Sequence, residues 1–486
     1  MLPFADDVQR CRAAQQAWAR QPVRERLKPL RSLRRLLVSE ADRIGAAVQR
    51  DVQRRPDEVL ATDILPTADA CRFLQRRAAS ILRPRKISLL DRPLWLFGEH
   101  STVHRRPHGV VGIIGTWNYP IYLNGIQIVQ ALSAGNGVLW KPSELMPQSA
   151  RLLHELFLTA GYSAELLRLL PGTREAGPQL AEADIDHVVF TGSAAVGRKL
   201  ATRLGERLIS STLELSGCDA LFVLADADLE LAARAAWFGV TLNNGQTCLA
   251  VRRIFVQQAV YPEFVLALEP LAKQAQPVTL VQDSQVRQAE QLVAEAVAEG
   301  ARLLVPRSTV REPQSTMVPA IVADARPEMA LCRDASFAPV TALLKFTDLA
   351  EALQMDSQCG YALGASIFTA NERLANQLAA RLGPGMIAIN DALAPVAHPA
   401  TPFGGRGASG WGSTQGVEGL LGMTVPQVVS LRSGRFRPHY DPLEQNPHVA
   451  ALTRGMLEMT HGTLRQRWTG LKRVLRQAPR FLRAGE

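Results

Sequence analysis

The chain of 486 residues has no long uninterrupted run of apolar residues, although 47% of its residues are hydrophobic. A membrane-spanning helix needs about 18 or more such residues in a row, so none is predicted. Charged residues such as Asp6, Asp7 and Arg10 interrupt the first twenty positions, and we expect no secretory leader there. A chain this long exceeds one ordinary hydrophobic core, so two or three domains are expected.

Cysteine is scarce, and the six cysteines are scattered at Cys11, Cys71, Cys218, Cys248, Cys332 and Cys359. No C-x-x-C pair and no histidine cluster at metal-ligand spacing occurs, so no metal is predicted. Free thiols in a reduced, cytoplasmic protein are the simplest interpretation.

Acidic residues are few near the C-terminus, where the basic residues gather. From Leu431 to Glu486 there are eleven Lys and Arg against four Asp and Glu, which supplies +7 of the net charge of +10. The rest of the chain is nearly balanced and shows no aromatic-plus-basic pattern of a nucleic-acid-binding module. Nucleic acid is not expected as a partner.

The spacing of apolar residues predicts helices in the first part of the chain and strands that alternate with helices in the rest. Leucines at helical spacing predict helices over residues 4–83, and the proline-rich stretch that follows resists helix and predicts a β-hairpin excursion. Strands are then predicted at 109–115, 137–140, 166–170, 187–190, 219–224 and 253–256, with helices at 122–134, 147–160 and after Gly192. Such alternation is typical of doubly wound parallel sheets, which bind ligands at the carboxyl ends of their strands. We expect an α/β fold with two lobes and a cleft.

Two reactive side chains stand out in this pattern. Cys248 follows a turn marked by Gly245, and a cysteine there can face a cleft where dipoles or cations lower its pKa. A lone cysteine is more often a small core residue. Glu214 lies between Leu213 and Leu215, where it is either exposed or held in a site as a partly desolvated general base.

Asn118 and Lys141 follow the first two strands of the alternating series. Asn118, in the segment Thr-Trp-Asn-Tyr-Pro, can donate its side-chain N–H to a developing oxyanion, or it is simply a turn residue. Lys141 and Glu144 offer a cation and a carboxylate where a nucleotide ribose would lie, or they belong to a solvated loop.

A glycine turn follows the strand at 187–190. Gly192, Ser193 and Gly197 precede or open a helix whose free N–H groups can bind phosphate. The segment is not a G-x-G-x-x-G fingerprint, so alone it indicates little.

Together, and in this order along the chain, these motifs resemble the aldehyde dehydrogenase superfamily over roughly residues 5–430. The late segments Asn390-Asp391, Pro402-Phe-Gly-Gly405 and Ser409-Gly410 look like those of the family. The resemblance is strongest to the class-3-like branch of fatty and aromatic (coniferyl-type) enzymes. It implies a homodimer with an NAD(P)-binding domain over 1–213 that carries an oligomerisation excursion at 84–107. A catalytic domain at 214–400, a return segment at 401–430 and a basic extension at 431–486 would follow.

The resemblance also implies a mechanism for oxidising an aldehyde to a carboxylic acid. Cys248 would attack the aldehyde carbon while Asn118 and the Cys248 N–H hold the oxyanion. Hydride would pass to the nicotinamide, and Glu214 would activate the water that hydrolyses the thioester. The remaining residues would bind cofactor: Lys141 and Glu144 the adenosine ribose, Gly192, Ser193 and Gly197 the pyrophosphate, with Trp117 and Phe337 near the reacting groups. NAD is expected, because Glu144 would compete with a 2′-phosphate, and NADP stays possible.

Three departures from the family pattern bear on turnover. Ala335 stands where the family usually has an acidic residue that bonds the nicotinamide ribose, and Ala338 stands where Gly is usual. Ser216-Gly-Cys218 replaces the common Gly-Gly-Lys. Slow turnover is therefore open, as are an acyl-CoA-forming reaction and a redox-impaired binding protein, although an intact Glu214 argues against the acyl-CoA reaction.

The basic extension ends in an amphipathic pattern. Leu464, Trp468, Leu471 and Leu475 form a stripe at helical spacing among many arginines. Such a helix fits an anionic membrane surface, which would suit a lipophilic aldehyde, or it docks on a partner subunit or on the enzyme body.

Overall fold

The computed structural model describes residues 2–305, 315–434, 437, 440 and 447–484. The chain divides into two compact units, one of residues 1–81 and 107–425 and the other of residues 82–106 and 426–486. We call them unit 1 and unit 2.

Unit 1 contains a six-stranded sheet of strand order β19-β7-β6-β3-β4-β5. Its parallel strands are β3 (Val110–Ile114), β4 (Gly137–Lys141), β5 (Leu167–Leu169), β6 (His187–Thr191) and β7 (Ser210–Glu214), and β19 (Gly410–Trp411) adds an antiparallel edge. Every residue of β3 and β4 is buried, which is why these strands read as continuous apolar runs in the sequence. The predicted parallel sheet is confirmed.

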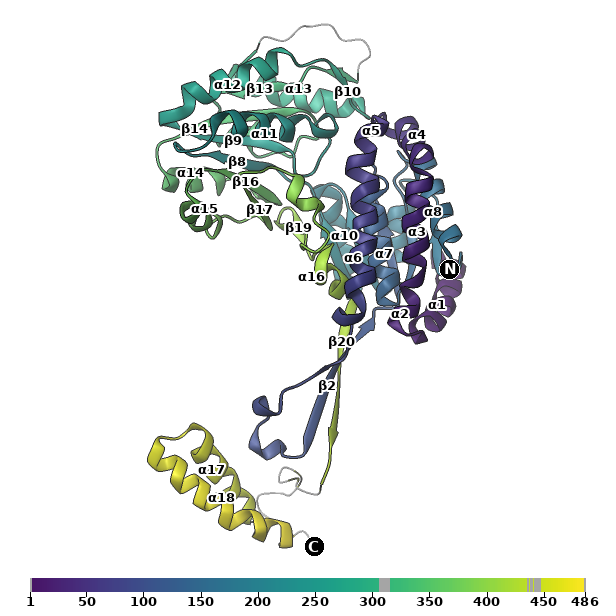
Figure 1. Ribbon diagram of the computed structural model, residues 1–486, viewed down its shortest axis with the longest axis vertical. Helices are drawn as coiled ribbons and strands as arrows, with labels where there is room; N and C mark the ends of the chain where they lie inside the picture. The colour runs from purple at the N-terminus through teal and green to yellow at the C-terminus, as the bar shows by residue number, and fades with distance from the viewer. Residues whose placement is uncertain (1, 306–314, 435–436, 438–439, 441–446, 485–486) are drawn as a thin grey trace. The chain divides into compact units, whose positions relative to one another are not determined.

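Helices pack against this sheet, and the predicted ones lie where expected; the N-terminal helices are purple in Figure 1. The N-terminal series is α1 (Ala5–Arg20), α2 (Val23–Arg26), α3 (Lys28–Ser39), α4 (Ala41–Val52), α5 (Pro56–Val59), the π-helix η1 (Leu60–Ile64) and α6 (Leu65–Ile81). Those between strands are α7 (Tyr122–Ala134), α8 (Pro147–Ala160), α9 (Ala176–Glu182) and α10 (Ala194–Glu206). Helix α10 begins directly after the glycine turn.

The second sheet of unit 1 has seven strands in the order β11-β13-β14-β9-β8-β16-β17. Its strands are β8 (Asp219–Val223), β9 (Val251–Gln257), β11 (Arg302–Leu303), β13 (Ala320–Ala323), β14 (Val340–Phe346), β16 (Gly364–Phe368) and β17 (Met386–Ile389). Successive side chains of β8 point to opposite faces of the sheet. Phe222 packs toward α13 (Asp283–Ala298), whereas Leu221 packs toward α11 (Leu229–Thr241) and α12 (Tyr261–Lys273). The chain passes from the first sheet to the second between Glu214 and Asp219.

Shorter elements complete unit 1: α14 (Leu349–Asp356), α15 (Glu372–Ala379), α16 (Gly416–Gly422), β10 (Val278–Thr279), β12 (Thr316–Met317), β15 (Tyr361–Ala362) and β18 (Arg406–Gly407).

Unit 2 contains a small antiparallel sheet and a helical hairpin. The sheet has the order β1-β2-β20, formed by β1 (Arg85–Lys86), β2 (Glu99–Pro107) and β20 (Thr424–Arg432). The hairpin consists of α17 (Pro447–His461) and α18 (Leu464–Ala484), and α18 is the amphipathic helix that the sequence predicts. None of the helices among the described residues is long and apolar enough to cross a membrane.

Candidate active site

The segment before Cys248 folds into an unusual tight turn. After α11 ends, Asn243, Asn244 and Gly245 take φ angles of 52°, 55° and 75° in succession, all left-handed. Only glycine fits at the third position, because a Cβ on Gly245 would come within 2.4 Å of the Pro339 backbone nitrogen. The turn predicted at Gly245 is therefore present, and it delivers Cys248 just before β9.

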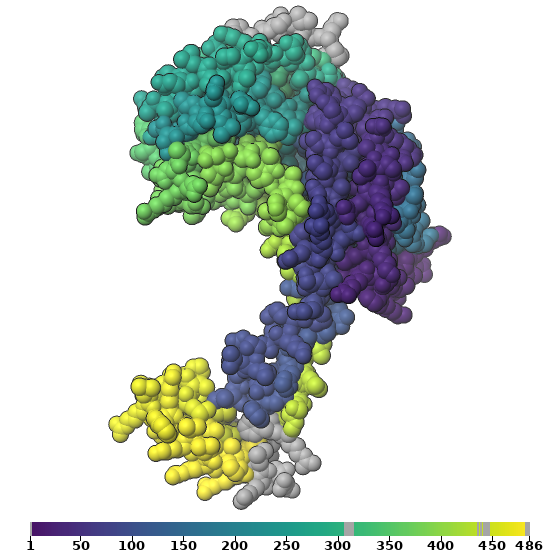
Figure 2. All heavy atoms as spheres, viewed as in Figure 1, coloured from purple at the N-terminus to yellow at the C-terminus, as the bar shows by residue number. Residues whose placement is uncertain are grey.

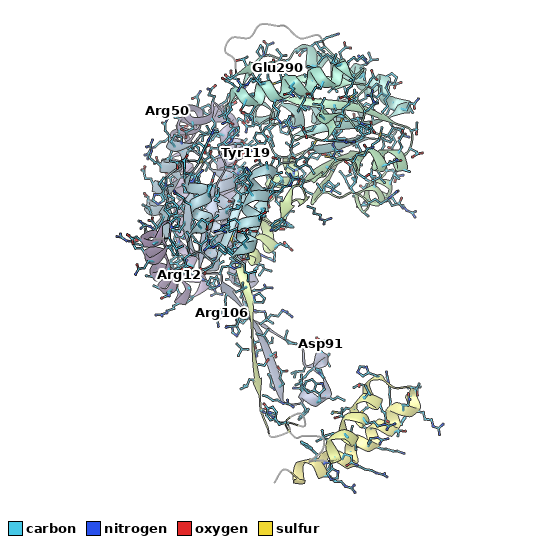
Figure 3. The ribbon with its side chains drawn as sticks, turned by 180° about the vertical axis from the view of Figure 1, so that it is seen from behind. Arg12, Arg50, Asp91, Arg106, Tyr119 and Glu290 are labelled. Atoms are coloured by element: carbon cyan, nitrogen blue, oxygen red, sulfur yellow. The ribbon has the colours of Figure 1, made fainter. Side chains whose placement is uncertain are left out.

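Cys248 lies where two cavities meet. An apolar cavity of about 220 Å³ is lined by Cys248 and by side chains that include Tyr119, Leu123, Phe238, Leu242 and Phe403. A central cavity of about 310 Å³ is lined by Cys248, Asn118, Glu214, Trp117 and Phe337 among others. The structure thus brings together the residues that the sequence proposed as catalytic, and Tyr119 can be located in Figure 3.

The Cys248 thiol is protonated in this environment. Burial, followed by the negative charges of Asp219 and Glu214, raises its pKa to about 12. The backbone N–H groups of Leu249 and Cys248 act in the opposite direction and lower the pKa. The same N–H groups can stabilise negative charge that develops beside the sulfur.

Glu214 ends β7 as a buried carboxyl group, with 3% of its surface exposed. Neither oxygen completes a hydrogen bond with a described residue, although the Thr414 backbone N–H acts to lower the pKa of Glu214. Burial dominates and raises the pKa of Glu214 well above its usual range. Of the two readings of Glu214, the structure shows the buried one, with the side chain lining a cavity.

Asn118 follows β3 and reaches the Cys248 loop. Its side-chain nitrogen donates to the Gln246 carbonyl at 3.1 Å, and its side-chain oxygen accepts from the Thr116 hydroxyl at 3.0 Å. A carboxamide nitrogen carries two N–H groups, so one remains for an acceptor in the central cavity, which Asn118 lines.

A buried ion pair positions Asn118. The Arg54 guanidinium pairs with the fully buried Asp63 carboxylate and donates to the Asn118 carbonyl at 3.2 Å. Asp63 accepts from the N–H groups of Ile121 and Tyr122, both at 3.0 Å, at the start of α7. Sequence reasoning missed this pair, because the only signal is a charged residue inside a helical pattern.

Arg252 is a second positioning residue that the sequence did not reveal. Its guanidinium is fully buried and donates to the carbonyls of Gly245 and Ala338. It therefore joins the turn before Cys248 to the loop that carries Phe337. Burial lowers the pKa of Arg252 to about 10.

A third, outer cavity of about 640 Å³ holds the proposed nucleotide-binding residues. Lys141, Glu144, Gly192 and Ser193 line it. Glu144 pairs with Lys141 at 3.6 Å and with Arg174 at 3.1 Å. Thr116, Trp117, Gly192 and Ser193 line both this cavity and the central one, so the two are neighbours.

Arg174, Lys199 and Arg203 also line the outer cavity, and sequence reasoning had not named them. Gly197 is not among the residues that line it. A Cβ on Gly197 would lie 2.5 Å from Leu215, so this glycine allows α10 to pack closely on the segment after β7.

The central cavity also contains Ala335, the position at which the family usually has an acidic residue. Ala335 lines it beside the glutamines Gln282, Gln285 and Gln288. Gln285 donates to the Phe337 carbonyl at 3.0 Å, and the Phe337 ring meets Trp117 edge to face at 5.6 Å. This part of the lining is therefore polar, and Ala335 adds no charge to it.

The chain is similar to known proteins along nearly its whole length. The Aldehyde dehydrogenase family model matches residues 4–429. A 4,4'-diapolycopene aldehyde oxidase of Methylomonas sp is 34% identical over 439 residues, which cover 89% of this chain and 82% of that protein.

Solved structures of the same kind superpose well. A Mycobacterium tuberculosis aldehyde dehydrogenase complexed with NAD+ has a TM-score of 0.82 and 28% identity, covering 88% of this chain and 90% of that one. The NAD+ complex of an aldehyde dehydrogenase from Bacillus cereus has a TM-score of 0.82 and 26% identity, with 88% of each chain covered. The family match and the cavity around Cys248 agree, and the chain belongs to the aldehyde dehydrogenase family.

Proposed function

We propose that the protein oxidises an aldehyde to a carboxylic acid with NAD(P)+ through a covalent intermediate on Cys248. The observation that carries this proposal is the position of Cys248, which closes an apolar cavity on one side and faces Asn118 and Glu214 on the other. An aldehyde can reach the sulfur from the apolar side while the polar groups act from the central cavity.

The first chemical step needs a thiolate and an oxyanion site. The Cys248 thiol loses its proton to solvent, and Glu214, the one carboxylate among the described residues that line the central cavity, remains available as the base for the later hydrolysis. The sulfur then bonds to the aldehyde carbon. The free N–H of Asn118 and the Cys248 backbone N–H stabilise the resulting alkoxide.

The second half of the reaction resolves the thioester on Cys248. Glu214 takes a proton from a water molecule, whose oxygen attacks the thioester carbon and displaces the sulfur. A carboxylate whose pKa is raised by burial is a stronger base than an exposed one, which suits this role. The Cys248 thiol is restored and the carboxylic acid leaves.

The central and outer cavities fit a nicotinamide dinucleotide, which supplies the hydride acceptor when bound. Lys141 and Glu144 would hold the adenosine ribose, and the N-terminus of α10 after Gly192 and Ser193 would face the pyrophosphate. Trp117 and Phe337 would flank the nicotinamide. The NAD+ complexes of the structural neighbours support this assignment. We propose NAD as the main cofactor, while Arg174 beside Glu144 leaves NADP as a second one.

We propose an apolar aldehyde as the substrate. The walls of the apolar cavity are aromatic and aliphatic, with Phe238, Leu242, Val396 and Phe403 around the approach to Cys248. The relative from Methylomonas is named for an aldehyde of diapolycopene, which supports this class and does not specify the compound. The class-3-like branch remains our proposal for the chain's place within the family.

We also propose a homodimer in the cytoplasm with a peripheral membrane contact. Strand β20 is a sheet edge with exposed Val428, Val429 and Leu431, and such an edge is a template for pairing with a second copy. The six cysteines are all free thiols, which supports a reducing compartment.

An assay of reduced-nicotinamide formation across a panel of aldehydes tests the function. We expect activity to increase with the length of an aliphatic aldehyde, and we expect Cys248→Ala to abolish it. Cys332→Ala, at a buried thiol that lines neither the apolar nor the central cavity, is the matched control. Absence of turnover with every aldehyde, together with absence of cofactor binding, would contradict the proposal.

A further inference from the structure

The positive charge of this protein belongs to unit 2 as a whole. Its two segments, 82–106 and 426–486, contain seventeen Lys and Arg against six Asp and Glu, a net +11. The whole chain has a net charge of +10, so unit 1 is close to neutral. A neutral enzyme body is thus joined to a strongly basic appendage, and the catalytic cavities need none of that charge.

Within unit 2, helix α18 packs on α17 through one face. Gly455 and Gly470 allow this contact, since a Cβ on Gly470 would lie 2.5 Å from the Gly455 carbonyl oxygen. Leu452 and Phe481 are buried in the hairpin core, and Arg473 pairs with Glu458 at 3.2 Å. This face of α18 is fully used by the hairpin.

A second face of α18 is apolar and uncovered. Leu464, Trp468 and Leu475 are 80%, 66% and 66% exposed, and their spacing places them along one line of the helix. An α-helix turns by roughly 100° per residue, so this line lies about a third of a turn around the helix axis from Gly470 and Phe481, the residues that face α17. The hairpin, yellow in Figure 2, therefore folds without burying these side chains.

A row of basic side chains runs beside the apolar line. Arg465, Lys472 and Arg476 are exposed and share one sector of the helix by their spacing of seven and four residues. Within the part of the chain that the structure describes, none of the three has an acidic partner at ion-pair distance. An apolar line with a parallel basic row is the pattern of a helix that lies in a lipid–water interface.

We propose that α18 docks the protein on an anionic lipid bilayer, with Leu464, Trp468 and Leu475 in the headgroup region and the basic row on anionic headgroups. The charge of unit 2 selects such a surface, since each Lys or Arg near it adds attraction. A second copy fits this face less well, because a two-fold contact would place one basic row against the other. Nucleic acid would leave the apolar line exposed to water.

Vesicle sedimentation of the full-length enzyme tests the docking. The vesicles are pure phosphatidylcholine, or equal parts of phosphatidylcholine and phosphatidylglycerol. We expect wild type to pellet only with the anionic vesicles and to be released by high salt. Arg465→Gln/Lys472→Gln/Arg476→Gln should weaken the partition by about a hundredfold, since each of the three charges contributes about 1 kcal/mol. Leu464→Ser/Trp468→Ser/Leu475→Ser should abolish the pelleting.

The matched control is Arg24→Gln/Arg31→Gln/Arg35→Gln, which removes the same charge from exposed positions of unit 1 and should pellet like wild type. All variants should keep the aldehyde activity of wild type on a water-soluble aldehyde, so a loss of docking is separable from a failure of the proposed reaction. Equal pelleting of wild type and the apolar variant overturns the proposal. A second outcome would also overturn the proposal: wild type does not pellet with either kind of vesicle, and the apolar variant changes the oligomeric mass in solution. That result would assign the apolar line to a contact with a second copy.

Discussion

Cys248 and Glu214 line the same cavity, and the charge of Glu214 is one of the influences that raise the pKa of the thiol. Burial raises the pKa of Cys248 most, the charge of Asp219 has the next largest effect, and the charge of Glu214 follows. With a pKa of about 12, the thiol keeps its proton at neutral pH, because the thiolate fraction falls tenfold for each unit below the pKa. The free protein therefore holds Cys248, the proposed nucleophile, in its unreactive thiol form.

Alkylation by iodoacetamide should report this protonation state. In the free enzyme we expect the rate at Cys248 to rise about tenfold per pH unit from neutral pH upward, without a plateau below pH 10, because the thiolate fraction is still growing. Saturating NAD+ should raise the rate at neutral pH, since a cationic nicotinamide ring beside the sulfur favours the thiolate. Peptide mass spectrometry gives the site, and a plateau below pH 10 would contradict a pKa of about 12 for Cys248.

Replacing Glu214 should separate the two halves of the reaction. In Glu214→Gln we expect a burst of about one reduced nicotinamide per site followed by turnover slowed roughly 10²–10⁴-fold, because the thioester forms but no base activates water. Stopped-flow absorbance measures the burst. The exposed Glu230→Gln on α11 is the control and should behave as wild type. Equal losses of burst and steady state would show that Glu214 acts before the thioester.

Ala335 should be a position where affinity for the cofactor can be gained. We expect Ala335→Glu to lower the KM for NAD+ about tenfold, because two new hydrogen bonds to the nicotinamide ribose contribute about 1 kcal/mol each, partly offset by burial of the charge. The KM for the aldehyde should stay unchanged. Ala335→Gln, which has the length without the charge, should show a smaller gain. An unchanged KM in both variants would place the ribose elsewhere.

Glu144 and Arg174 should govern the choice between NAD and NADP. We expect Glu144→Gln to raise kcat/KM with NADP relative to NAD about tenfold, because a carboxylate next to a 2′-phosphate is repulsive. Arg174→Ala should reduce the use of NADP and leave NAD almost unaffected. Glu175→Gln, at the neighbouring carboxylate, is the control. A ratio that does not change in Glu144→Gln would remove Glu144 from the ribose site.

The Arg54–Asp63 pair should matter for both stability and catalysis. Asp63→Asn removes the fully buried counterion of Arg54 and leaves it the partly exposed Glu58 at 3.4 Å, so we expect the free energy of unfolding to fall by about 3 kcal/mol. The activity of the folded fraction should fall as well, since Arg54 holds the Asn118 carbonyl. Urea denaturation and steady-state rates measure the two effects. Asp57→Asn, at an exposed pair with Arg55, should change neither, and equal effects of the two substitutions would argue against a positioning role.

The sequence predicts the sheets and the reactive side chains better than it predicts what holds them in place. The strands around Val110–Ile114 and Gly137–Lys141 are buried on both faces, so their apolar runs are visible in the sequence. Cys248, Glu214 and Asn118 become candidate catalytic residues because motifs of a known family surround them. Glu214 alone is ambiguous, since a carboxylate between two leucines is compatible with exposure.

Arg54, Asp63 and Arg252 could not be found in this way. Each is a charged residue in an ordinary local context, and its partner lies in a part of the chain that only the fold brings close. Gly197 shows that a sequence pattern can also suggest a role where the fold shows a different one. It stands in a phosphate-binding pattern, yet it allows α10 to pack against Leu215. The amphipathic period of α18 is visible in the sequence, whereas the face that packs on α17 depends on Gly455 of that helix.

The position of Cys248 between two cavities has a consequence for timing. In the proposed reaction, an acyl group bound to the sulfur would occupy the apolar side, whereas water and Glu214 would act from the other side. The contents of the central cavity can therefore be exchanged while the acyl chain stays in place. A bulky, poorly soluble product can be held until hydrolysis is complete, so the enzyme need not release any intermediate of the reaction into water.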